Sequence, residues 1–166
     1  MITSRTANWF KTKVRFEKVA EDGLNKFVTE DYVVDALSHT EAEERITEEM
    51  SAFVSGEFEV KSIVPASFKE VFFSDDPEDD RWYQAKVALI TFDENTSKEK
   101  RTNINYLVQA GTLKKAVKNI EEGLGGSMMD YSIVSLAETK FWDVYTYKKS
   151  TQDDDFVDGK SKAAGE

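Results

Sequence analysis

Two segments of the chain combine tryptophan with basic residues in an alternating pattern. Each begins with a tryptophan and continues with lysine or arginine at even spacing, as strands that expose one side do. These residues are Trp9, Lys11, Lys13 and Arg15 in the first segment, and Trp82 and Lys86 in the second. On an open sheet, aromatic rings stack on unpaired bases, at roughly 1–3 kcal/mol per base, while neighbouring cations contact the phosphates. The pattern therefore predicts a surface that binds single-stranded DNA.

The two tryptophans are the residues that we expect to stack on bases. Phe10 and Tyr83 are the next candidates, because they take over this role if the two strand faces are the other way round. The residues expected to contact phosphates are Lys11, Lys13, Arg15, Lys86, Lys100 and Arg101.

Other chemistry finds little support in the sequence. His39 is the one histidine and the chain contains no cysteine, so neither a histidine–cysteine metal site nor a cysteine nucleophile is available. The paired glutamates at 43–44 and 48–49 are spaced to face solvent on a helix, and the glycine-rich run 123–126 follows a helix instead of opening one, which is the wrong side for holding phosphate. We therefore expect no enzyme activity, no metal and no cofactor.

The elements that position the strands occur twice. Residues Trp9 to Phe72 align with Trp82 to Tyr145 at an offset of 73 or 74 positions, with apolar character kept at most positions. The predicted fold is α+β, a tandem duplication of a ββαβ(β) unit that forms antiparallel sheet(s) with one helix per copy. The expected strands are 9–16, 27–36, 58–64 and 68–73, then 82–92, 100–110, 131–137 and 141–147.

Each helix begins at a capping residue. Ser38 and Glu41 have the spacing of a capping box, and an apolar stripe from Ala42 to Phe53 follows. The second helix is expected from Thr112 to the glycines at 125–126. In the first copy, Pro65 is expected to separate the last two strands.

Charge and composition divide the chain into four parts. The first repeat is 1–74, an acidic connector of net charge −4 is 75–81, the second repeat is 82–149, and an acidic tail of net charge −3 is 150–166. The tail has too little apolar content to fold. It either keeps the protein in solution or presents a peptide to replication proteins through Asp153, Asp154, Asp155 and Phe156.

The location expected from the sequence is the cytoplasm of a bacterial host cell. No segment has the eighteen or so uninterrupted apolar residues of a membrane span, and the N-terminus lacks the apolar block of a signal peptide.

Several short motifs together resemble an uncharacterised family of small proteins from Bacteroidetes and their phages. The motifs are Trp9-Phe10-x-x-Lys13-Val14, Val28-Thr29-Glu30-x-Tyr32-x-Val34-Asp35-Ala36, Thr40-Glu41-Ala42-Glu43-x-Arg45-Ile46, Ser55-Gly56-Glu57-Phe58, Arg81-Trp82-Tyr83-x-x-Lys86-Val87 and Ala137-Glu138-Thr139. The resemblance extends nearly to Tyr145. It implies an accessory role in phage or mobile-element replication or recombination, and a sheet domain with an acidic tail is similar in layout to phage single-stranded-DNA-binding proteins. It implies no catalytic residues.

Two functions therefore follow from the sequence. The first is non-catalytic binding of single-stranded DNA. The second is a protein-interaction or structural module, in which Trp9 and Trp82 pack between the copies and the acidic helix segment 41–49 is the recognition surface. Exposure of the two tryptophans separates these alternatives.

Overall fold

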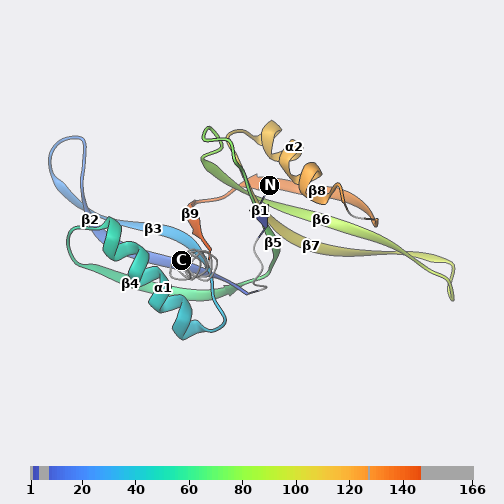
Figure 1. Ribbon diagram of the computed structural model, residues 1–166, viewed down its shortest axis with the longest axis horizontal. Coiled ribbons are helices and arrows are strands. Elements are labelled where there is room, and N and C mark those ends of the chain that lie inside the picture. The colour runs from blue at the N-terminus through green and yellow to red at the C-terminus, as the bar shows by residue number, and fades with distance from the viewer. Residues whose placement is uncertain (1, 4–7, 127, 147–166) are drawn as a thin grey trace, which may run out of the picture.

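The computed structural model describes residues 2–3, 8–126 and 128–146, which form two β-sheets and two helices (Figure 1). The architecture is α+β, as predicted. The elements are β1 (Ile2–Thr3), β2 (Trp9–Val19), β3 (Asn25–Asp35), α1 (His39–Phe53), β4 (Phe58–Ala66), β5 (Phe68–Phe73), β6 (Arg81–Asp93), β7 (Lys98–Ala110), α2 (Leu113–Leu124), β8 (Asp130–Glu138) and β9 (Phe141–Tyr145).

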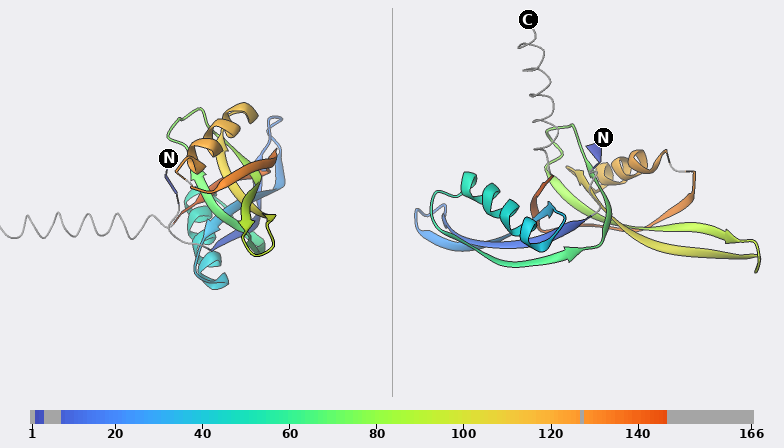
Figure 2. Two further views of the ribbon diagram at one scale, coloured as in Figure 1. Left: turned by 90° about the vertical axis from the view of Figure 1, so that its right-hand side faces the viewer. Right: turned by 60° about the horizontal axis from the view of Figure 1, so that its bottom comes forward.

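Each sheet is built on a long hairpin. The β2–β3 hairpin belongs to a four-stranded sheet of order β4-β2-β3-β9, and the β6–β7 hairpin belongs to a five-stranded sheet of order β1-β5-β7-β6-β8. The first hairpin turns at Gly23 and the second near Ser97, which both have positive φ. The two hairpins extend in opposite directions from the centre of the molecule (Figure 2, right).

The last strand of each half belongs to the sheet of the other half. β5 pairs in parallel with β7, and β9 pairs in parallel with β3. The sheets are mainly antiparallel, as expected, but each contains one parallel pair, because each half sends its final strand across to the neighbouring hairpin. The boundary between 1–74 and 82–149 separates two stretches of sequence, but it does not separate two self-contained sheets.

The two exchanges have matching registers. Val71 lies opposite Leu107 in one sheet, and Val144 lies opposite Val33 in the other. The central strands also have irregular pairing at matching places, between residues 13 and 14 of β2 and between residues 86 and 87 of β6. The halves therefore have the same arrangement at the 73–74-residue offset.

Both helices begin at the predicted caps. The Ser38 hydroxyl accepts a hydrogen bond from the Glu41 amide at 3.1 Å, and the Thr112 hydroxyl accepts one from the Lys115 amide at 3.1 Å. The Glu41 carboxylate accepts from the Leu37 amide at 3.4 Å, one residue before the cap. The buried residues of α1 are Ala42, Ile46 and Met50, and those of α2 are Ala116, Asn119, Ile120 and Leu124.

Two local expectations are wrong. Phe53 lies at the end of α1 with most of its side chain exposed, and its ring makes an edge contact with Phe16. Pro65 does not interrupt the strand. β4 continues to Ala66, since Pro65 lies on an edge strand, where a missing amide donor is tolerated.

The acidic connector is held in place by Asp79. Its buried carboxylate accepts hydrogen bonds from the Gly111 amide at 2.9 Å, from the Asn119 side chain at 3.3 Å and from the Ser74 hydroxyl. Burial raises the pKa of Asp79, but these hydrogen bonds and the charge of Lys115 outweigh it and leave the pKa below its ordinary value. The connector is therefore fastened to the start of α2.

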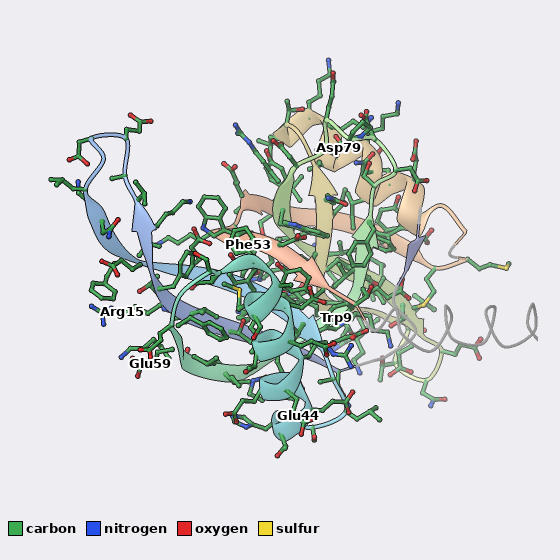
Figure 3. All side chains as sticks on the ribbon, turned by 60° about the vertical axis from the view of Figure 1, so that its left-hand side comes forward. Trp9, Arg15, Glu44, Phe53, Glu59 and Asp79 are labelled. Atoms are coloured by element: carbon green, nitrogen blue, oxygen red, sulfur yellow. The ribbon has the colours of Figure 1, made fainter. Side chains whose placement is uncertain are left out.

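The apolar side chains form three cores. Two of them lie between a sheet and its helix, as the strand patterns predict. The third lies where the faces that point away from the helices meet. Its buried members are Trp9, Val33, Phe68, Val71, Trp82, Leu107 and Val144. This central core joins the halves, and Figure 3 shows Trp9 in the crowded middle of the molecule.

Candidate nucleic-acid interface

The two tryptophans expected to stack on bases are buried. Trp9 is 1% exposed and Trp82 is 2% exposed, and both belong to the central core. Both lie on the face away from the helices, as the alternation predicts, but the exchanged strands β5 and β9 bring Phe68, Val71 and Val144 over them. In this fold neither indole can meet a base, so their assignment as stacking residues is wrong. Burial of both tryptophans between the halves is the outcome that the protein-interaction alternative predicts.

Phe10 and Tyr83 are also inside the protein. Phe10 packs beneath α1 and Tyr83 packs beneath α2, each in a helix-covered core. The strand faces are therefore not reversed, and these two rings are unavailable for stacking as well.

Most of the basic residues, unlike the tryptophans, are exposed. Lys13, Arg15, Lys86 and Arg101 are exposed, and the strand registers place them on the faces away from the helices. Lys11 lies on the same face of β2, but it is partly buried, with its ammonium 5.6 Å from the ring centroid of Phe68. Five of the six predicted phosphate contacts therefore lie on the predicted face.

Lys100 does not lie with the others. It pairs with Thr91 across the β6–β7 hairpin, whereas Arg101 pairs with Ile90. Because adjacent residues of a strand point to opposite faces, Lys100 lies on the helix side of the sheet. The hairpin register decides this, and sequence reasoning had not assigned it.

An exposed phenyl ring accompanies the cations on each face. Phe27, which is 61% exposed, lies opposite Glu17 on the same face as Arg15, and the Arg15 guanidinium carbon lies 4.2 Å from the centre of the Phe27 ring. Phe92, which is 66% exposed, lies two positions along β6 from Ile90, the residue opposite Arg101. Sequence reasoning missed both rings. Alternation along each strand is the signal that would have found them, since Phe27 lies at even spacing from Val33 and Phe92 lies at even spacing from Trp82.

A groove of about 510 Å³ lies where the two sheets diverge from the central core. Lys11 and Asp31 of the first sheet face Gln84 and Lys86 of the second across it, and Lys140 lies on the connection between β8 and β9. One of its two carboxylates, Glu138, forms a 3.5 Å ion pair with Arg81. The groove therefore joins the basic parts of the two faces.

The family model for a domain of unknown function, DUF4494, matches residues 8–147. The chain belongs to this family. The expectation of an uncharacterised family is thus confirmed. No curated protein and no solved structure matches the chain. The part that matches the DUF4494 model includes both hairpins, both helices and the two exchanged strands.

In this DUF4494 chain, α1 carries an acidic surface. Glu43, Glu44 and Glu48 line a hollow of about 530 Å³ together with Thr40 and Thr47. Figure 3 shows Glu44 at the outer margin of the molecule. This is the surface of the alternative function predicted from the sequence.

The remaining expectations about the DUF4494 chain concern metals, membranes and the tail. Within residues 2–3, 8–126 and 128–146, no group of three or more histidine, cysteine or acidic residues is placed to hold a metal ion. None of the helices in the same ranges has the length and apolar character that a bilayer crossing requires. The tail residues Asp153, Asp154, Asp155 and Phe156 lie outside the described residues.

Proposed function

We propose that the chain is a non-catalytic single-stranded-DNA-binding protein that uses the sheet faces away from its helices. Because both tryptophans are buried, the proposal rests instead on the pairing of Arg15 with the exposed ring of Phe27, at 4.2 Å. An exposed ring beside a guanidinium offers a stacking surface and a phosphate contact within one nucleotide's reach.

The first face has mixed charge, since Asp31 pairs with Lys13 and Glu59 pairs with Arg15. Further cations follow the strands of both faces. On the first sheet, Lys13 lies two positions along β2 from Arg15, and on the second, Lys86 occupies the equivalent place. Neutral hydrogen-bonding side chains lie around Lys86, among them Gln84 and Ser135. Cations spaced along a strand suit a phosphate backbone, whose contacts carry most sequence-independent affinity.

We also infer that the chain arose by tandem duplication of the ββαβ(β) unit. Matching strand registers, matching irregularities and equivalent helix caps support this inference. It explains why two similar faces are present. The role in phage or mobile-element replication, and the contact of the tail with replication proteins, rest on the family resemblance and the tail composition and stay predictions.

A titration of fluorescently labelled single-stranded oligonucleotide tests the proposed function. We expect binding at low salt that weakens as salt rises, because bound cations release counterions from the phosphates. Replacing Phe27 and Phe92 together by alanine removes the stacking rings, at about 1–3 kcal/mol per stacked base. Phe53→Ala is the matched control, since Phe53 is exposed to a similar degree at the end of α1. If the wild-type chain binds no oligonucleotide even at low salt, the proposal is wrong.

The second candidate function is protein docking through α1. Glu43, Glu44 and Glu48 line one hollow, and no ion pair of theirs is found among the described residues. A basic partner would gain association rate and selectivity from this surface. If this function is the correct one, the oligonucleotide titration fails, and charge reversal of Glu44 and Glu48 lowers the affinity for the partner.

A further inference from the structure

A buried carboxylate beside an exposed tryptophan forms a second, separate site on the first sheet. Glu30 is buried, and its carboxylate accepts a hydrogen bond of 2.5 Å from the Tyr32 hydroxyl. The Lys18 ammonium lies 3.5 Å from the other Glu30 oxygen and 5.0 Å from the ring centre of Trp142, on the exchanged strand β9. A carboxylate and an indole ring thus hold one cation between them.

The fold itself does not require this charged arrangement. At the 74-residue offset, the second half has Ile104 in place of Glu30, and Ile104 packs against the core beneath α2. The positions equivalent to Lys18 and Trp142 are Thr91 and Lys69. An apolar residue therefore completes the same fold, and replacing a buried ion pair by apolar residues is often neutral or stabilising. Packing of the sheet therefore does not by itself explain why Glu30, Lys18 and Trp142 lie together.

The cation in the site is the exchangeable part. Lys18 is about half exposed and lies next to the end of β2, on a long flexible stem. Trp142 is 58% exposed, so its ring remains open to solvent. Glu30, in contrast, is fixed by Tyr32 and by its burial. The carboxylate is therefore held in place, whereas the ammonium that contacts it is partly exposed.

We propose that Glu30 and Trp142 form a receptor for an arginine side chain of a partner protein, and that Lys18 occupies this receptor in the free chain. A planar guanidinium can bind the carboxylate and stack on the indole ring at the same time, whereas an ammonium is a point charge. An incoming arginine therefore replaces Lys18, which moves into solvent.

The experiment uses the full chain and N-acetyl-arginine amide as the probe. N-acetyl-citrulline amide, which has the same shape without the charge, is the neutral control. Lys18→Met keeps the stem and removes the competing charge. Binding is followed by the NMR signal of the Trp142 indole, since Trp9 and Trp82 are buried. We expect Lys18→Met to bind the arginine probe about tenfold or more tightly than the wild-type chain, because self-occupancy lowers apparent affinity.

Two further variants separate this site from general charge effects. Lys61→Met removes one positive charge from β4 of the same sheet, outside the site, and is expected to bind the probe as the wild-type chain does. Glu30→Ile, added to Lys18→Met, introduces the residue of the second half and is expected to keep the fold and abolish binding. The proposal is overturned if Lys18→Met prefers arginine no more than citrulline, if it binds no better than the wild-type chain, or if binding survives Glu30→Ile.

Discussion

The phenyl ring of Phe72 stacks on the phenol ring of Tyr106, with ring centres 5.6 Å apart and planes inclined by 18°. Phe72 comes from the end of the first half, whereas Tyr106 lies in the hairpin of the second half. In the other sheet, Tyr145 stacks on Tyr32 in the same way, at 5.7 Å and 20°. Each half therefore supplies a ring to the core under the other half's helix, and neither core is complete without both halves.

Phe72→Ala is expected to destabilise both halves together. Removing a fully buried phenylalanine costs about 3–5 kcal/mol. Because the strands are exchanged, we expect one cooperative urea transition, with the same midpoint by tryptophan fluorescence and by circular dichroism. Phe92→Ala, at an exposed ring, is the control and changes stability by about 0.5 kcal/mol or less. Separate transitions of the two halves would contradict the interlocked arrangement.

Gly123→Ala tests how closely α2 approaches the exchanged strand. A Cβ atom at Gly123 would lie 2.8 Å from the Phe72 ring, which is held on its other face by Tyr106. We expect overpacking to lower the free energy of unfolding by about 1–3 kcal/mol, while the better helix propensity of alanine raises it by about 1 kcal/mol. Gly56→Ala has open space and is expected to be nearly neutral. Thermal unfolding of the two variants measures the difference, and a higher midpoint for Gly123→Ala than for the wild-type chain would show that the ring moves aside.

The strand faces could be predicted from the sequence, but not what covers them. Alternation correctly separated Trp9 from Phe10, because period two is a local property of an extended chain. The burial of Trp9 depends on Phe68 and Val144, which are distant in sequence and arrive through parallel pairing. The local residue pattern of β5 or β9 does not indicate with which hairpin that strand pairs.

The candidate interface was predictable to a similar extent. Lys13, Arg15 and Lys86 lie on the predicted face because they share a strand with residues whose pattern is clear. Lys100 and Phe27 follow the same alternation, at even spacing from Tyr106 and Val33, but they lie near hairpin turns, where the expected pattern was not applied. The register also depends on the turn conformation. Gly23 is a residue type that favours positive φ and lies in the expected turn, whereas the positive φ of Ser97 could not be predicted from its type.

Asp79→Asn is expected to loosen the connector and to remove part of the acid sensitivity. Near neutral pH the free energy of unfolding is expected to fall by about 1–3 kcal/mol, since the variant replaces hydrogen bonds to a charged acceptor. The pKa of Asp79 is lowered in the folded chain. The contribution of Asp79 to folding stability is therefore present above the pKa of the unfolded chain, about 3.9, and is lost as the pH falls below that pKa. Urea midpoints near pH 7 and pH 3 measure this. The gap between wild type and variant must narrow in acid, and Asp75→Asn, on the exposed part of the connector, is the control.

Tyr145→Phe is expected to reduce the sensitivity to alkali. Burial, followed by the carboxylates of Asp143, Glu49 and Glu30, raises the pKa of Tyr145 to about 12. Because this is above the unfolded value of about 10, the neutral phenol stabilises the fold fully below pH 10, and this contribution disappears as the pH rises through 12. Phenylalanine is the residue at the equivalent position 72, so the variant is expected to fold. Urea midpoints at pH 8 and pH 11 are compared, and an equal fall in both proteins would contradict the assignment.

Arg101→Ala and Lys100→Ala form a matched pair for the proposed interface. The two residues are adjacent, exposed and equally charged, but they lie on opposite faces of β7. If the face away from α2 binds single-stranded DNA, Arg101→Ala weakens the oligonucleotide affinity. It also lowers the slope of log K against log salt by about 0.7, the value for one phosphate contact to a single strand. Lys100→Ala leaves that slope unchanged. Equal effects of the two variants would indicate a nonspecific response to net charge, and a larger effect of Lys100→Ala would place the binding surface on the helix side.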